Sequence, residues 1–153
     1  MSEEYTLNIV DEEFVFEFDG VIPGPVNPRR LGGVLLSQPG STSPSTGDSK
    51  ALIRIPEEMN GLRLTAVGAS CSTAGSSGAT SVQLRRVRAG VGVDMLSTPV
   101  TIDANETDSS TATAAAVIDT NNDDVQTGDQ IHFDIDSVSS GARGLYISFT
   151  FNT

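Results

Sequence analysis

The sequence is poor in the residues on which most protein chemistry depends. It has no tryptophan and only one cysteine (Cys71), one histidine (His132) and one lysine (Lys50). A single cysteine excludes an intrachain disulfide. No histidine or cationic cluster lies beside Cys71 in sequence to activate its thiol. We therefore expect Cys71 to be a small buried residue near the end of a strand.

The scarcity of histidine and cysteine also restricts catalysis. Any Ser-His-Asp or Cys-His arrangement would have to use His132, and no Gly-x-Ser-x-Gly elbow occurs. His132 alternates with Asp134 and Asp136, a spacing that favours a solvated strand face over an ion site, because one strand offers few converging ligands. Spacing alone does not exclude a pair of catalytic carboxylates. We expect no enzyme activity, no cofactor and no metal.

Positive charge and long apolar runs are both scarce. The chain has 20 acidic and 9 basic residues, a net charge of −11. Clustered cations are needed to bind nucleic acid or an anionic membrane, so we expect neither partner. No apolar run approaches the roughly 18 residues that span a bilayer, and the first residues lack the features of a signal peptide. We expect a soluble protein made in the cytoplasm.

Serine, threonine and glycine are abundant, and this balance favours short strands and turns. Residues 51–153 are predicted to form one β-sandwich or jelly-roll-like domain, because alternating segments are separated by turn signals at short intervals. The expected strands are 51–55, 62–69, 81–88, 91–96, 98–102, 111–117, 130–136 and 144–152. The segment 111–117 is ambiguous, since its alanines also suit a helical turn.

Two further regions precede this domain. Residues 1–20 are predicted to form an extended N-terminal β arm in which Phe14, Phe16 and Phe18 share one face. A change of parity near residues 11–12 indicates a turn or bulge. The aromatic face must be covered by its own domain, a neighbouring subunit or a partner lattice. Residues 21–50 are rich in proline, glycine and serine and are predicted to be a linker.

Two charged clusters invite a functional interpretation. The series Asp119-x-Asn121-x-Asp123 is similar to the start of a calcium loop but lacks the later glycine and glutamate, so we favour an Asx-rich turn. Arg86 and Arg88 belong to the only basic cluster and are interpreted either as a solvated strand end or as an anchor between subunits. In the second hypothesis they pair with the acidic stretch 103–136 of a neighbouring copy in a homotrimer.

The stretch from Arg88 to Phe151 resembles a family of small β-sandwich domains found in the virions of tailed phages. The resemblance is carried by the segments 94–107, 116–125, 127–129, 134–136 and 142–149. Members of this family occur in head decoration proteins, head fibres and tail appendages. The resemblance implies a place in the virion and a role without catalysis, but it does not say which part of the virion, because such modules occur in heads and tails alike.

On this basis we expect a capsid decoration, or cement, protein on the capsid surface. Its partners would be the major capsid protein and other copies of itself, most simply in a homotrimer, with Phe14, Phe16, Phe18, Arg86 and Arg88 at the contacts. The alternative is a tail or head-fibre component that binds host-surface glycans. Glycan binding needs exposed aromatic rings, for which only Tyr5 and Tyr146 are candidates.

Overall fold

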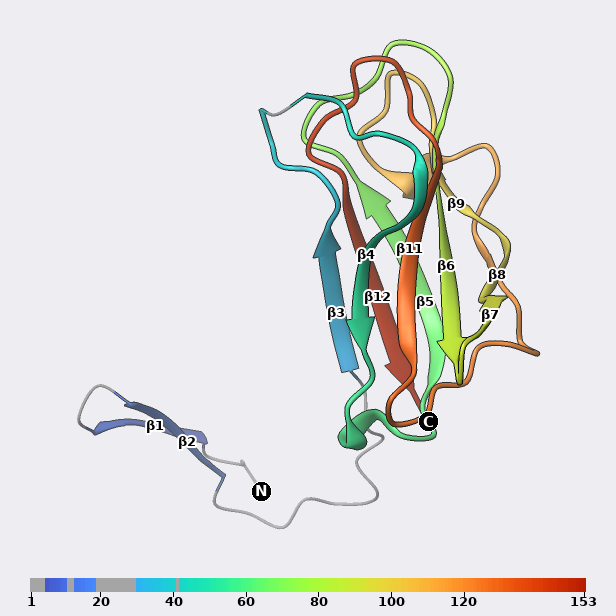
Figure 1. Ribbon diagram of the computed structural model, residues 1–153. Helices are drawn as coiled ribbons and strands as arrows, with labels where there is room; N and C mark the ends of the chain where they lie inside the picture. Colours follow the sequence, from blue (N-terminus) through green and yellow to red (C-terminus); the bar gives the residue numbers. More distant parts are fainter. Residues whose placement is uncertain (1–4, 11–12, 19–29, 41) are drawn as a thin grey trace.

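The protein is an all-β sandwich, as the alternation of the sequence predicts. The structure is a computed structural model that describes residues 5–10, 13–18, 30–40 and 42–153 (Figure 1). Helical structure in these residues is restricted to two short 3-10 turns, η1 (Glu57–Met59) and η2 (Ser109–Thr111). No helix in the described part of the chain is long and apolar enough to cross a membrane.

One layer of the sandwich is an antiparallel sheet in the order β4-β11-β6-β7. Its strands are β4 (Gly47–Arg54), β11 (Gln130–Ser137), β6 (Thr80–Arg88) and β7 (Val91–Asp94), and β9 (Val100–Ile102) pairs with the first part of β6. The short strands β8 (Leu96–Thr98) and β10 (Val117–Ile118) pair with each other beside it.

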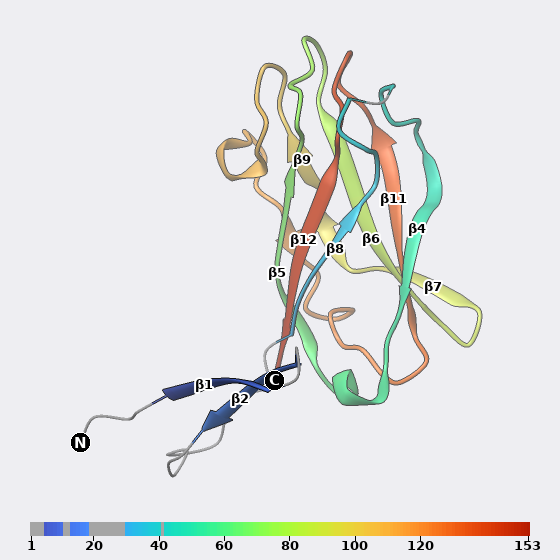
Figure 2. The same cartoon turned by 90° about the vertical axis from the view of Figure 1, so that its left-hand side faces the viewer.

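The other layer is a three-stranded antiparallel sheet in the order β3-β12-β5. It consists of β3 (Arg30–Leu35), β12 (Tyr146–Asn152) and β5 (Arg63–Ser70). Seen together, Figures 1 and 2 place β3 and β4, the two edge strands that come first in this part of the chain, along the same flank of the sandwich.

The core lies between the two layers and is built by alternation. In β11 the residues Ile131, Phe133 and Ile135 are at most 2% exposed. In β12 the inward set Ile147, Phe149 and Phe151 meets them. The rings of Phe133 and Phe149 have centroids 5.8 Å apart and join the two sheets, a spacing at which aromatic pairs stabilise each other beyond their buried area.

The expected strand 91–96 is split into β7 and β8, because the chain turns inward at the fully buried Met95. Where the strand is interrupted, the side chain of Gln83 supplies hydrogen bonds in place of those between paired strands. Its amide nitrogen donates to the Leu96 carbonyl at 2.9 Å, and its oxygen accepts from the N–H groups of Leu84 and Leu96. A buried glutamine thus satisfies backbone groups that would otherwise lack partners.

Two other expectations were wrong. The residues 21–50 were expected to be a linker, but 30–35 form β3 and 47–50 begin β4, so much of the second half belongs to the sandwich; residues 21–29 lie outside the described residues. The residues 111–117 were expected to form a strand, but η2 ends at Thr111 and β10 begins only at Val117. Alanines give such a segment little side-chain surface to bury in a sheet.

Candidate interaction surface

Three successive rows of outward positions on the β3–β12–β5 sheet carry no charged side chain, and the next row contains the exposed Arg63 opposite Asn152. Residues directly opposite each other in antiparallel strands point to the same face. The register gives three outward rows: Leu35–Tyr146–Ser70, Gly33–Ser148–Gly68 and Leu31–Thr150–Ala66. In a chain with 20 acidic and 9 basic residues, this absence of charge sets the surface apart. We call these residues the uncharged face.

The uncharged face is apolar at its ends and hollow in its middle. Leu31 is 76% exposed, Leu35 49% and Tyr146 40%. The row between them contains two glycines and a serine; the Tyr146 ring reaches over Gly33, and few side-chain atoms stand above the backbone at Ser148 and Gly68. Two shallow grooves meet here, one of about 340 Å³ beside Leu31 and one of about 470 Å³ beside Tyr146.

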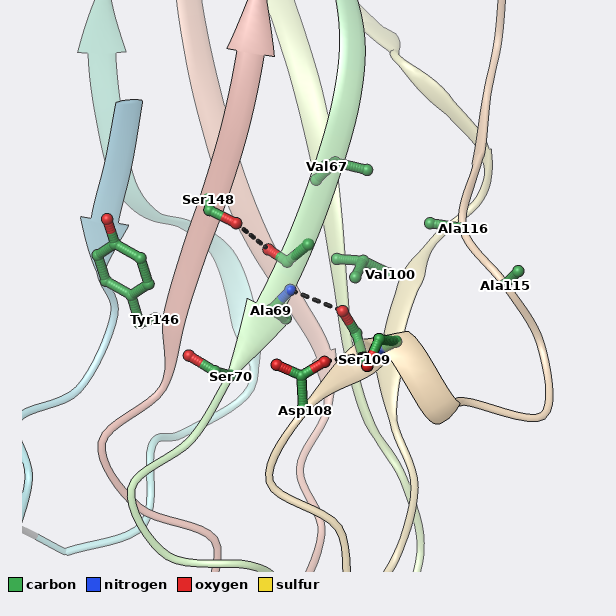
Figure 3. A pocket seen from close by; sticks show the side chains of 12 residues that line it. Val67, Ala69, Ser70, Val100, Asp108, Ser109, Ala115, Ala116, Tyr146 and Ser148 are labelled. Carbon is green, nitrogen blue, oxygen red and sulfur yellow. Dashed lines mark hydrogen bonds between the residues drawn. The ribbon is translucent and has the colours of Figure 1, made fainter. Parts of the chain in front are cut away.

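The glycine pair of β3 lets two aromatic rings lie against the strand from opposite sides. A β-carbon on Gly32 would lie 2.4 Å from the Phe149 ring, on the core side. A β-carbon on Gly33 would lie 1.6 Å from the Tyr146 hydroxyl, on the outer side. Figure 3 shows Tyr146 beside β3. The Leu-Gly-Gly-Val-Leu sequence, which was taken as part of a linker, is therefore fitted to the aromatic residues of β12.

The loop that contains η2 forms a wall along the β5 side of the uncharged face (Figure 3). The Ser109 hydroxyl accepts a hydrogen bond from the Ala69 N–H at 2.8 Å, and Asp108 forms an isolated β-bridge with Ser70. Hydrogen bonds from Ser110 lower the pKa of Asp108. The open edge of β5 is thus partly closed, and Asp108 is a charge at the rim of the larger groove.

The outer face of the other sheet is charged, in contrast. One row there aligns Leu52, His132, Arg85 and Asp94, and the Arg85 Nε lies 3.5 Å from Asp134. The two broad faces of the sandwich therefore differ in chemistry. Of these two faces, the uncharged face is the one that a partner can cover at low cost, because no charged group on it has to lose its water.

Asp134 does not lie on a solvated face as expected, since it is only 6% exposed. The edge strand β4 bulges opposite it, with Gly47 across from Ile135 and Ala51 across from Phe133. Within the bulge Ser49 has a φ of 52°, and its N–H donates to Asp134 at 2.6 Å. The carboxylate thus replaces a ladder partner. Asp136 is exposed as expected, and its pKa is raised by partial burial and by Asp134, Asp94 and Asp48.

Arg86 and Arg88 bind acidic residues of their own chain. Arg86, 8% exposed, forms an ion pair with the Asp124 carboxylate and donates to the Asp124 carbonyl at 2.6 Å. Arg88 donates to both oxygens of Asp129, at 3.0 and 2.7 Å, and to Asp124 at 2.9 Å. We call these four residues the arginine clasp. The stretch 103–136 supplies the partners, as expected, but from the same chain, because residues 119–129 fold over the end of β6.

The clasp shifts the pKa values of Asp124, Asp129 and Arg88. Burial raises the pKa of Asp129, but hydrogen bonds from Arg88 and from the Gln126 N–H outweigh it, so the pKa lies below its ordinary value. Asp124 follows the same balance with Arg88 and Arg86. The pKa of Arg88 is raised, first by its hydrogen bond to Asp129. Both carboxylates of the clasp are therefore ionised at neutral pH.

The acidic loop is an Asx turn, as favoured from the sequence. The Asp119 carboxylate accepts hydrogen bonds from the Asn121 N–H at 3.0 Å and from the Asn122 amide at 2.8 Å. Asp123 is paired with Arg63 at 2.6 Å. Among the described residues no group of three or more histidine, cysteine, aspartate or glutamate side chains is arranged to hold a metal ion.

Cys71 is buried directly after β5, as predicted, and burial raises the pKa of its thiol. A raised pKa lowers the fraction of reactive thiolate at neutral pH. The residue therefore behaves as a small core side chain.

Phe14, Phe16 and Phe18 lie in β2 (Glu13–Phe18), which pairs with β1 (Tyr5–Val10) as an antiparallel hairpin. Residues 11–12, the expected site of the turn or bulge, lie outside the described residues. The register sets Phe14, Phe16 and Phe18 opposite Ile9, Leu7 and Tyr5. Because opposite residues share a face, all six belong to one face. The expected single arm is thus two strands.

No known protein family, curated protein or solved structure matches this chain.

The sequence reasoning missed the uncharged face because β3 was taken as linker. A signal was present: Leu31, Gly33 and Leu35 alternate with one parity, and Tyr146, Ser148 and Thr150 do the same in β12. Neither set contains a charged residue, and the residues between its members in the sequence face the core. This pattern indicates a strand whose outer face, like its inner face, lacks charge.

Proposed function

We propose that this protein is a structural component of a tailed-phage virion, most simply a head decoration protein that binds the major capsid protein and other copies of itself. One observation carries the proposal: an acidic β-sandwich presents one broad uncharged face with exposed leucine and tyrosine. Contiguous exposed apolar surface marks interaction sites on soluble proteins. The resemblance of residues 88–151 to virion β-sandwich domains agrees with this interpretation.

The charge distribution suits a protein that coats a shell. A net charge of −11 disfavours adsorption to nucleic acid and to other anionic surfaces. Attachment would then use surfaces where charge is absent, namely the uncharged face and the apolar face of the β1–β2 hairpin. Many copies on a regular lattice make weak individual contacts sufficient, since linked contacts reinforce one another.

The hairpin is the proposed anchor. In this role Phe14, Phe16 and Phe18 become buried when the hairpin is added to a sheet of the capsid protein or of a neighbouring copy. A homotrimer at a local three-fold axis is the simplest assembly that fits a capsid surface. Arg86 and Arg88 are left out of the contact surface, because the clasp already engages them.

The test is the number of copies per purified particle, measured by quantitative mass spectrometry against the major capsid subunit. A ratio near one, or one trimer per lattice axis, is expected. A handful of copies per particle would instead indicate the tail or neck. Absence from particles would refute a virion role.

A second experiment tests the anchor. A chain that lacks residues 1–20 should lose binding to particles stripped of this protein, while the substitution Leu52→Asp on the opposite, charged sheet should leave binding unchanged. Undiminished binding of the truncated chain would refute anchoring by the hairpin.

A tail or head-fibre component that binds host glycans is the second candidate. The larger groove favours it, because Tyr146 lines this groove together with Ser70, Ser109, Ser148 and Asp108, and sugars are bound by aromatic rings together with polar groups. Tyr146 is the one large exposed aromatic residue among those whose burial the structure describes. Titration with host polysaccharide should show binding that Tyr146→Ala abolishes; no heat of binding would reject this candidate.

A further inference from the structure

We propose that the β1–β2 hairpin of one copy packs its apolar face onto the uncharged face of a second copy, so that the chains associate by exchange of their N-terminal hairpins. In the proposed function the hairpin anchors the protein to the capsid protein or to a neighbouring copy, and this inference names the neighbouring copy. It rests on the proposed function only in taking the hairpin as an anchor. It requires neither a particle nor a capsid protein.

The first support is the composition of the hairpin. Its register places Tyr5, Leu7, Ile9, Phe14, Phe16 and Phe18 on one face and leaves Glu13 and Glu17 on the other. A two-stranded hairpin alone is at best marginally stable in water. An apolar face of six residues, four of them aromatic, needs a partner surface, and that surface should lack charge, because covering a charge without a partner is costly.

The second support is the match with the uncharged face. Its three rows contain no charged residue and are apolar at both ends, at Leu31 and at Leu35 with Tyr146. Phe14 and Phe18 are four residues apart, as are Leu31 and Leu35, a distance of roughly 13 Å in extended strands. The central phenylalanine would then lie above Ser148 and Gly68, where the two grooves meet, beside the Tyr146 ring that covers Gly33.

The third support is size. Each aromatic side chain buries about 150–250 Å², so one hairpin face covers several hundred Å² of its partner. Stable protein interfaces bury about 800 Å² on each partner. The four aromatic residues of one hairpin face would bury roughly 600–1,000 Å² if fully covered, so a single exchange approaches this size, and a reciprocal or cyclic exchange, in which each copy both gives and receives a hairpin, exceeds it.

The occupant is a second copy rather than the same chain for two reasons. Leu31 is 76% exposed and Leu35 49%, so the face is open to a partner. In addition, Pro23, Pro25 and Pro28 stand in the sequence between hairpin and sandwich, and such sequences favour extended spacers over tight reversals.

Cysteine trapping tests the proposal on the full chain, with Cys71→Ser as the background in all variants. One preparation carries Phe16→Cys and a second, of different tagged mass, carries Ser148→Cys. Mixing them under mild oxidation should give a disulfide-linked heterodimer at least tenfold above two matched controls. The controls are Glu17→Cys with Ser148→Cys, which uses the other hairpin face, and Phe16→Cys with Leu52→Cys, which uses the other sheet.

Equal trapping in the controls would mean random collision and would overturn the proposal. A chain that carries both Phe16→Cys and Ser148→Cys but closes only on itself, with no heterodimer in the mixture, would also overturn it and would assign the face to the chain's own hairpin.

Light scattering provides a second measurement that does not depend on the hairpin substitutions. Leu31→Asp should shift the protein toward the monomer, and Leu52→Asp, also at an exposed leucine, should not. A wild-type chain that is monomeric at about 100 µM would overturn the proposal, since a functional contact between soluble copies is expected in the micromolar range or tighter. These results concern purified protein, whereas the copy number on particles tests the virion role separately.

Discussion

Removal of the Arg88 guanidinium should be one of the most damaging single changes in the molecule. In the clasp, Asp129 is 3% exposed and receives hydrogen bonds from both guanidinium nitrogens of Arg88 and from the Gln126 N–H at 2.8 Å. Arg88→Met keeps much of the aliphatic contact but leaves a buried carboxylate with one donor. Breaking a buried pair in this way costs about 3–5 kcal/mol. Because the Arg88 side chain is 31% exposed, water replaces part of the interaction, and we expect a loss of about 2–3 kcal/mol.

The measurement is urea denaturation of the wild type, Arg88→Met, Asp129→Asn and the double variant, with Arg54→Met at an exposed position of β4 as the control. The control should change the free energy of unfolding by less than about 0.5 kcal/mol. The coupling energy between Arg88 and Asp129 should be about 1–2 kcal/mol, because Asp124 remains as a second partner of Arg88.

The pH dependence provides a further check. The folded pKa of Asp129 lies below its ordinary value, so the clasp stabilises the fold above the unfolded pKa of about 3.9. That contribution is lost as pH falls through the lower, folded pKa. The destabilisation by Arg88→Met should therefore be largest near pH 7 and should shrink toward about pH 3. A loss below about 0.5 kcal/mol at pH 7, or one independent of pH, would show that the clasp is an ordinary surface ion pair and refute this reasoning.

Three other predictions follow from contacts elsewhere. Gly32→Ala should destabilise by about 1–3 kcal/mol, because Phe149 is fixed in the core, whereas Gly33→Ala should cost less than about 1 kcal/mol, because the Tyr146 hydroxyl end can swing outward; equal losses in urea denaturation would contradict this. Gln83→Leu should cost about 3 kcal/mol by leaving the N–H and carbonyl of Leu96 unpaired, and an unchanged free energy of unfolding would mean that water replaces the amide. The pKa of Asp136 is raised, so its charged form opposes folding above the unfolded pKa. Asp136→Asn should then raise the melting temperature at pH 7 but not at pH 3, and an equal gain at both pH values would reject the electrostatic explanation.

The all-β architecture and most of its strands were predictable from the sequence, because alternation of apolar and polar residues is a local signal. The patterns of β11 and β12 are strong since each strand contributes three large inward residues to the core. The failures occurred where the determining contact is distant in sequence. Nothing near Gly32 and Gly33 shows that two aromatic rings of β12, more than 110 residues later, lie against them.

The same limit applies to the candidate site. The acidic partners of Arg86 and Arg88 were assigned to the correct stretch, but the sequence does not show whether that stretch belongs to the same chain or to another, because charge complementarity carries no information on connectivity. The uncharged face was invisible for a related reason: it exists only once three strands, taken from both ends of the domain, are placed side by side.

The bulge at Ser49 has a consequence for how copies can be crowded together. Edge strands with regular, unpaired backbone groups attract other edges and lead to open-ended aggregates. On the flank shared by β3 and β4, the bulge interrupts the regular run of β4, and Lys50 adds a charge within it. Continuous sheets cannot grow through that edge. One of the two neighbouring edges on this flank is therefore protected against edge-to-edge pairing between copies.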